Sequence, residues 1–219
     1  QLKQMQERVL TSTDEELNRS KMEILSGLMR LRQICDTPAL FMEDYHGDSG
    51  KLESLLELLE QIQTGSHRVL IFSQFRGMLD IIEKELKKMK METFKITGST
   101  PAKERQEMTN AFNNGEGDAF LISLKAGGVG LNLTGADTVI LVDLWWNPAV
   151  ESQAIGRAHR MGQERNVEVY RLITRGTIEE KIQELQESKR HLVSTILDGT
   201  ESRSSLTVAE IREILGIST

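Results

Sequence analysis

The sequence predicts an α/β fold: a parallel sheet with helices on both faces, and helical extensions at both ends of the chain. Two observations predict it. Between residues 68 and 173, continuous apolar runs typical of strands buried on both faces alternate with helical patterns. This alternation requires parallel pairing through crossover connections. The 219 residues, 38% of them hydrophobic and 27% charged, suffice for one such domain with helical additions.

The first 64 residues, 1–64, read as a helical lead-in. In the motif "TDEE", Thr13 and Glu16 form a capping box that begins a long helix running to about Ile34. The Asp-Thr-Pro sequence that follows ends this helix, because proline disfavours helical geometry in the preceding residue. A second helix is expected over about 51–63, since its leucines fall on one face.

Residues 65–176 form the predicted central domain. Thr100-Pro101 and Asn147-Pro148 are expected to begin its later helices, with proline at the first helical position of the former. The predicted helices are about 76–90, 101–113, and one that begins at 148 and carries an arginine motif. The predicted strands are 68–74, 93–97, 119–124, 138–144 and 167–173. Ligands of such sheets bind at the carboxyl ends of the strands.

The last segment, 177–219, returns to helix. "TIEE" supplies a second capping box, Thr177 with Glu180, and its helix is expected to reach about Leu197. After a polar stretch, the motif "TVAE" at 207–210 begins a short terminal helix.

Composition excludes several classes of protein. The single cysteine, Cys35, excludes an internal disulfide and an all-cysteine metal site, and fits a reducing compartment. No apolar run is long enough to span a membrane and no secretory signal opens the sequence, so no membrane partner is expected. The chain starts at Gln1, which we interpret as a fragment or a processed product. The net charge of −6 does not indicate a nucleic-acid binder, although a local basic face stays possible.

A glycine-rich loop, "SLKAGGVGLNLTGA", follows a predicted buried strand. Glycines such as Gly128 and Gly130 let backbone amides approach an anion closely, and Ser123 and Lys125 add a hydroxyl donor and a charge. The alternative is a tight turn that requires positive φ. A second glycine motif, "GDSGKL" at 47–52, lacks the first glycine, the Ser or Thr and the preceding strand of a phosphate loop, so we interpret it as a helix start.

The motif "QAIGRAHRMGQ" carries Gln153, Arg157 and Arg160 at i, i+4 and i+7, so the three side chains are expected to share one stripe of a helix. Arginine forks onto phosphate oxygens, and two arginines one turn apart could hold a γ-phosphate during its transfer. The alternative is a solvated basic face that pairs with Glu151 or Glu164.

Two adjacent tryptophans occur in "LWWNP", 144–148, at a predicted strand end. Because neighbouring side chains on a strand point in opposite directions, one tryptophan is expected to be exposed at the ligand face. There it could stack on bases or on a partner surface. The alternative places both under loops.

Together these motifs resemble the second motor lobe of SWI/SNF-type ATPases of helicase superfamily two, over roughly residues 20–200. The resemblance is carried by "RVLIFSQF", "ITGSTPAKERQEMTNAF", the 123–163 block and "VYRLITRGTIEEKI", and extends to "LRQICDTPALF" and "SGKL". It implies a RecA-like parallel sheet in a three-layer sandwich like that of P-loop NTPases. It also implies a brace helix that starts near Thr177.

The resemblance further implies that ATP and Mg²⁺ bind mainly to an N-terminal RecA-like lobe of the same protein, whose phosphate loop and Asp-Glu motif do not occur in this sequence. By the family motifs, Arg157 and Arg160 are arginine fingers and Gln153 opens the same motif. The loop with Gly128 and Gly130 couples nucleotide to DNA. This lobe is expected to be inactive alone.

The implied DNA partner is the backbone of a duplex, read with little base specificity and without strand separation. The residues expected to contact it are Ser73, Gln74, Thr97, Gly98, Arg105, Ser123, Lys125 and, near the groove, Trp146. A DNA-bound protein is a possible target of the motor. The "WWNPAVE" form favours a bacterial protein, placed in the cytoplasm at the nucleoid; a eukaryotic member would be nuclear.

Three alternatives stay open. One is the C-terminal lobe of a strand-separating helicase of the same superfamily. Another is a non-catalytic interaction module, which predicts that Arg157 and Arg160 pair internally with acids rather than facing an open cleft. A dinucleotide-binding domain is disfavoured, because no G-x-G-x-x-G opens a first strand–helix turn.

Overall fold

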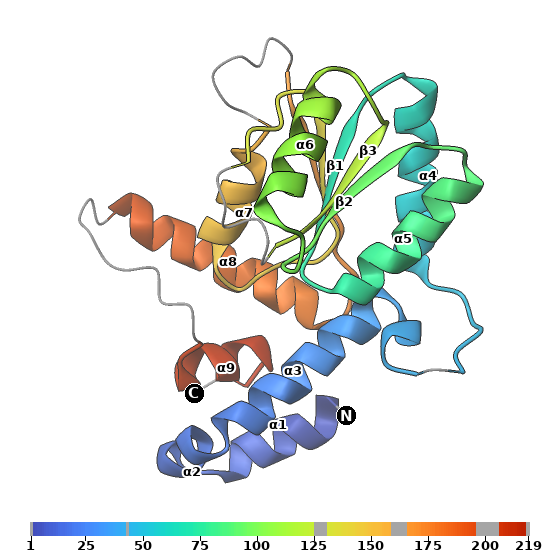
Figure 1. Cartoon of the computed structure of the whole chain (residues 1–219). Helices are drawn as coiled ribbons and strands as arrows, with labels where there is room; N and C mark the ends of the chain where they lie inside the picture. Colours follow the sequence, from blue (N-terminus) through green and yellow to red (C-terminus); the bar gives the residue numbers. More distant parts are fainter. Residues whose placement is uncertain (1, 43, 125–130, 159–165, 196–205, 218–219) are drawn as a thin grey trace. The chain divides into compact units, whose positions relative to one another are not determined.

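The computed structural model describes residues 2–42, 44–124, 131–158, 166–195 and 206–217 (Figure 1). The chain groups into two compact units. The sheet unit comprises 47–143 and 150–172, and the helical unit comprises 1–46, 144–149 and 173–219. This grouping joins the first and last segments of the chain into one unit and places the helix at 50–64 with the sheet.

The sheet unit holds five parallel strands in the order β2-β3-β1-β4-β5, as the alternation of strand and helix predicts. Each strand coincides with a predicted strand but is shorter at one or both ends. In the central register, Ile71 pairs with Leu121 on one side and with Ile140 on the other. The strands are β1 Val69–Ser73, β2 Thr93–Ile96, β3 Ala119–Ser123, β4 Thr138–Leu141 and β5 Glu168–Arg171.

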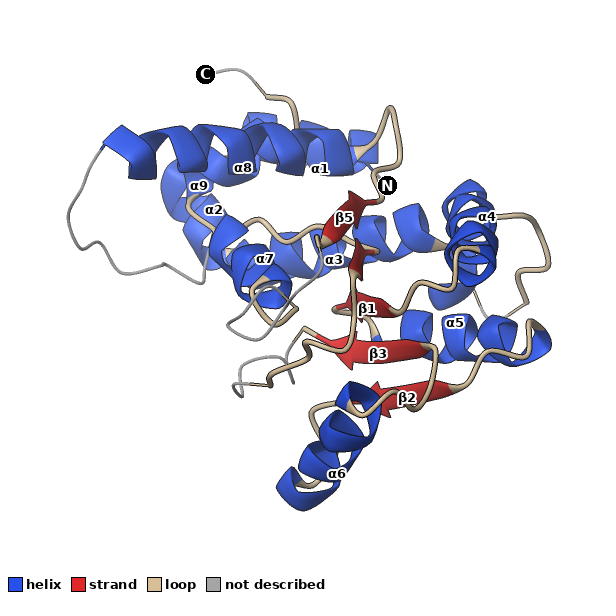
Figure 2. Ribbon diagram, turned by 90° about the horizontal axis from the view of Figure 1, so that it is seen from above, coloured by secondary structure: helices blue, strands red, loops and turns tan. Residues whose placement is uncertain are grey.

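Helices cover both faces of this sheet, with α4 and α5 on one side and α6 and α7 on the other (Figure 2). Alternating strand residues separate the two faces. Leu70 and Phe72 of β1 pack with Phe112 of α6 and Ala154 of α7 in a fully or almost fully buried cluster. The helices are α4 Gly50–Thr64, α5 Arg76–Lys88, α6 Ala102–Asn113 and α7 Pro148–Ile155.

Two helix boundaries differ from prediction. Helix α6 begins one residue late, with Pro101 at its N-cap, and Thr100 instead accepts a hydrogen bond from the backbone N–H of Thr97. Helix α7 ends at Ile155, and the Arg157 N–H bonds to the carbonyl of Ala154 in a tighter turn. The prediction of one continuous helical stripe is therefore wrong for Arg157.

The helical unit is built from both ends of the chain. The predicted first helix is two helices that break at Ser20, while the capping box of Thr13 and Glu16 is confirmed. The Thr177–Glu180 box is altered, because the Thr177 hydroxyl accepts from the Glu179 N–H rather than from Glu180. The elements are α1 Leu2–Thr11, α2 Asp14–Arg19, α3 Lys21–Asp36, the 3₁₀ helix η1 Pro38–Leu40, α8 Ile178–Thr195 and α9 Val208–Ile214.

Candidate functional site

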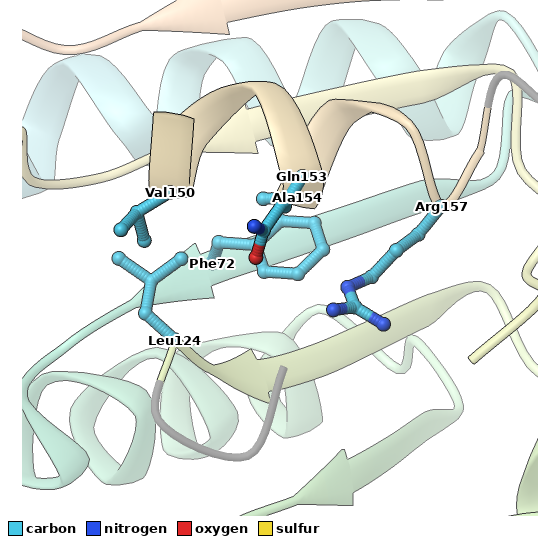
Figure 3. A pocket seen from close by; sticks show the side chains of 6 residues that line it. All are labelled: Phe72, Leu124, Val150, Gln153, Ala154 and Arg157. Carbon is cyan, nitrogen blue, oxygen red and sulfur yellow. The ribbon is translucent and has the colours of Figure 1, made fainter. Parts of the chain in front are cut away.

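A small pocket lies at the carboxyl end of the sheet, between its central strands and α7 (Figure 3). Phe72 comes from the end of β1 and Leu124 from the residue after β3. The other side is formed by α7 and the turn behind it, so Gln153 and Arg157 line the same pocket although they do not share a helix. The full lining is Phe72, Leu124, Val150, Gln153, Ala154 and Arg157.

Arg157 is held by its backbone and is largely buried. Its carbonyl accepts a hydrogen bond of 2.9 Å from the N–H of Leu133, and its neighbour Ala158 is fully buried in the core. The Arg157 residue is only 5% exposed, whereas Gln153 is exposed. In this structure the arginine therefore does not face open solvent.

Helix α7 is fixed to the sheet by an ion pair. Glu151 is completely buried, and one oxygen of its carboxylate, Oε2, lies 3.1 Å from Nε of Arg171 on β5. The sequence suggested Glu151 as a partner for the arginines of the motif. In the structure Glu151 pairs with Arg171 and so joins α7 to the edge strand β5.

Four predicted site residues, Lys125, Gly128, Gly130 and Arg160, lie outside the described residues. Ser123, which precedes the glycine-rich loop, is the last residue of β3 and is only 6% exposed.

The predicted DNA contacts at the end of β1 are turned inward. Ser73 is completely buried and donates its hydroxyl hydrogen bond to Asp143, which follows β4. The Gln74 side chain donates from Nε2 to Oδ1 of Asp143 at 2.7 Å, and its backbone N–H points to the same carboxylate. Sequence reasoning missed Asp143. The feature that could have indicated it is an acidic residue directly after the apolar run "TVILV".

The second predicted DNA region is the loop between β2 and α6. Arg105 donates from Nε to the carbonyl of Thr100 at 2.7 Å and from Nη2 to the carbonyl of Gly98 at 3.2 Å. The Thr97 hydroxyl lies 3.0 Å from that of Ser99. The arginine therefore holds this loop in shape, while Gly98 and Ser99 are exposed.

The tryptophans differ from the prediction that one of them is exposed. The chain bends after β4, so strand alternation does not apply to Trp145 and Trp146. Their rings stack with centroids 4.3 Å apart, and the buried guanidinium of Arg32 lies 5.3 Å and 5.1 Å from the two ring centroids. Trp146 is 6% exposed and packs in the core of the helical unit, so in this structure it offers no open stacking face.

Arg32 and Gln186 also hold the backbone of this segment. Arg32 donates to the carbonyl of Leu144, and Gln186 of α8 donates to the carbonyl of Trp145. The tryptophan segment is therefore fixed by helices from both ends of the chain, which the sequence order alone does not indicate.

The "GDSGKL" motif starts a helix, as interpreted. Ser49 caps α4 by accepting from the N–H of Leu52, and Lys51 is buried and donates to the carbonyl of Val142 at 2.9 Å. In the described part of the chain, no group of three or more acidic, histidine or cysteine side chains is placed to hold a metal ion. Nor does any helix there have the length and apolarity to cross a membrane.

This fold defines a class of protein, that of the helicase C-terminal domains. The model of the helicase conserved C-terminal domain matches residues 50–162. The chain is 44% identical over 201 residues to the putative ATP-dependent helicase/translocase YwqA of Bacillus subtilis, covering 89% of this chain and 22% of that protein. It is also 44% identical over 190 residues to the SWI/SNF-related matrix-associated actin-dependent regulator of chromatin subfamily A member 1 of Mus musculus, covering 81% and 18%.

Solved structures agree. The SWI2/SNF2 ATPase core of Sulfolobus solfataricus in complex with double-stranded DNA is 34% identical with a TM-score of 0.75, covering 100% of this chain and 46% of that chain. The C-terminal domain of the same ATPase is 34% identical with a TM-score of 0.71, covering 100% and 92%. The chain belongs to the SWI/SNF-type ATPases, as their C-terminal RecA-like lobe. It spans about a fifth of the length of the curated relatives it matches.

Proposed function

We propose that this chain is the second motor lobe of an ATP-dependent translocase on double-stranded DNA. The observation that carries the proposal is the pocket at the carboxyl ends of the strands, where Gln153 and Arg157 come together. A RecA-like lobe presents this edge to its ligands. The sequence has no phosphate loop of its own, so the nucleotide that these residues serve is held by another lobe.

In this proposal, ATP and Mg²⁺ bind mainly to the N-terminal lobe of the full-length protein. Arg157 and Arg160 place positive charge against the γ-phosphate when the lobes close, and stabilise the charge that develops during phosphoryl transfer. Gln153 supplies an exposed amide on the same pocket. The isolated chain is expected to hydrolyse no ATP.

The burial of Arg157 favours a second candidate, a non-catalytic interaction module that has kept the fold. An arginine finger has to reach a phosphate, and a 5% exposed residue reaches one only after its side chain moves or the pocket opens. In the motor proposal, closure on the N-terminal lobe moves the guanidinium of Arg157 out of its buried position toward the phosphate. In the alternative, the guanidinium stays buried beside α7.

Duplex DNA is the proposed track. The Sulfolobus solfataricus relative is an ATPase core solved in complex with double-stranded DNA. Contacts to the phosphate backbone give affinity with little sequence specificity, which suits a motor that steps along DNA. A protein bound to that DNA is the proposed target of the motion, at the nucleoid in a bacterium or in the nucleus of a eukaryote.

The test is DNA-stimulated ATP hydrolysis by the full-length protein, at saturating nucleotide and with duplex DNA. Arg157→Ala and Arg160→Ala are each expected to lower kcat by at least about a hundredfold, with folding and DNA binding intact. Lys84→Ala, which removes an exposed cation from α5, is the matched control and should keep the wild-type rate. Turnover near the wild-type value in both arginine variants would favour the interaction module.

A second measurement separates translocation from unwinding. A translocase on duplex DNA is expected to displace the third strand of a triplex but not to separate the strands of a forked duplex. ATP hydrolysis is expected with either DNA substrate. Strand separation of the fork would instead support the helicase alternative.

A further inference from the structure

The carboxylate of Asp143 binds the side chains of both residues at the end of β1, the buried Ser73 and the half-buried Gln74. Asp143 is completely buried and accepts hydrogen bonds from the Ser73 hydroxyl and from both the backbone and the side chain of Gln74. The other end of the Gln74 amide, Oε1, is buried as well. The Ser73 hydroxyl and one N–H of the Gln74 amide are therefore bound to Asp143 inside the lobe.

A buried carboxylate needs several donors, because a charge that is taken out of water without hydrogen bonds strongly destabilises the fold. The arrangement also joins neighbouring strands, since Ser73 ends β1 and Asp143 follows β4. Lys51 stabilises the same segment by donating a hydrogen bond to the carbonyl of Val142, the residue before Asp143. The turn that leaves β1 is therefore fixed in one geometry.

The next cation along this turn is Arg76, the first residue of α5. It is exposed, and no hydrogen bond or ion pair of its side chain occurs among the residues that the structure describes. The lysines further along α5 differ, since Lys87 pairs with Glu83 and Lys88 with Glu85. Arg76 thus follows the strand end at which ligands of such a sheet bind, with its donors directed to solvent.

We propose that Arg76 is the DNA-phosphate contact at the end of β1, and that Asp143 is a positioning residue that fixes the turn from which Arg76 extends. The proposal rests on the function proposed above and replaces the contacts expected of Ser73 and Gln74. An exposed arginine can form two parallel hydrogen bonds to one phosphate group, which the inward amide of Gln74 cannot.

The experiment measures the affinity of the full-length protein for duplex DNA over a range of salt concentrations, without nucleotide. Each phosphate contact adds about 0.9 to the slope of log affinity against log salt. Arg76→Gln is expected to lower this slope by about one unit, and Gln74→Ala to leave it unchanged. Lys84→Gln, which removes another exposed cation of α5, is the control and should leave the slope unchanged.

The positioning role of Asp143 is tested by a double-mutant cycle with Arg76. Asp143→Asn is expected to raise the DNA concentration for half-maximal ATPase activity without changing the KM for ATP, and its effect should be much smaller once Arg76 is Gln. Ser73→Ala removes one hydrogen bond to the same carboxylate and serves in its place if Asp143→Asn does not fold.

Three results would overturn the inference. The assignment of Arg76 fails if Gln74→Ala lowers the slope while Arg76→Gln behaves like Lys84→Gln. The positioning role fails if the effects of the Asp143 and Arg76 substitutions are additive. A wild-type protein that hydrolyses ATP but binds no duplex DNA would contradict the proposed function itself, and the inference with it.

Discussion

Glu151 and Arg171 form an ion pair in which the carboxylate is completely buried and the arginine side chain is 36% exposed. The pair joins the first turn of α7 to β5, so it fixes the helix that leads to Arg157. Replacing Arg171 by Ala removes this partner from the buried carboxylate and is expected to lower the free energy of unfolding by about 1–2 kcal/mol. This value is smaller than for a fully buried pair, because solvent screens the exposed arginine.

The matched variant removes the charge as well. Glu151→Gln combined with Arg171→Ala is expected to be more stable than Arg171→Ala alone, because a neutral amide is easier to bury than a carboxylate that has lost its Arg171 partner. Urea unfolding of the 219-residue chain measures both. Equal free energies of unfolding for the single and double variants would show that the ion pair with Arg171 does not stabilise the buried carboxylate.

Arg68 holds together the loops at the amino ends of the strands. Its guanidinium donates to the carbonyls of Gly117, Gly135 and Glu116 and lies 3.9 Å from the ring centroid of Phe112. Arg68→Lys is expected to destabilise the fold by about 2 kcal/mol, because an ammonium group cannot reproduce the planar fork. The comparison is Arg76→Lys, an exposed arginine outside such a network, which should unfold at the wild-type urea concentration.

Asp137 should make stability depend on pH at the acidic end. Burial alone would raise the pKa of its carboxyl, but hydrogen bonds from His67, Thr138 and the Arg68 backbone lower that pKa below its ordinary value of 3.8. The folded state then binds fewer protons than the unfolded state. The stabilisation is therefore fully present above the unfolded pKa and is lost as pH falls through the lower folded one.

The measurement is the free energy of unfolding of wild type and Asp137→Asn between about pH 6 and pH 3, a window set by that pKa. The advantage of the wild type should be constant above about pH 5 and shrink as pH falls below the unfolded pKa. An advantage that grows on acidification would mean that the folded-state pKa is raised instead.

The two tryptophans of the chain give an optical readout of the Arg32 stack. Removing the guanidinium in Arg32→Ala is expected to expose both rings to water and removes the hydrogen bond from Arg32 to the Leu144 carbonyl, so the tryptophan emission maximum should shift to longer wavelength. Arg30→Ala, an exposed residue of the same helix that lies over Phe41, is the control and should leave the emission unchanged. No shift in Arg32→Ala would show that the stack does not shield the tryptophans.

Local sequence determined the elements of this protein. Apolar runs placed β1, β3 and β4, and the capping residues Thr13 and Thr207 marked helix starts, because these signals depend only on near neighbours. The motif around Gln153 and Arg157 also pointed to the pocket, since the carboxyl edge of a parallel sheet follows from strand order alone.

The tertiary structure decided how individual side chains are used. Helix α7 ends early where the N–H of Leu133 bonds to the carbonyl of Arg157. Trp146 is buried where the chain bends toward Arg32, and the Gln74 amide binds Asp143. Each outcome depends on a partner many residues away in the sequence. Periodicity reports the face of an element, but burial and hydrogen-bond satisfaction are properties of the packed chain, and they determine which polar groups still face a ligand.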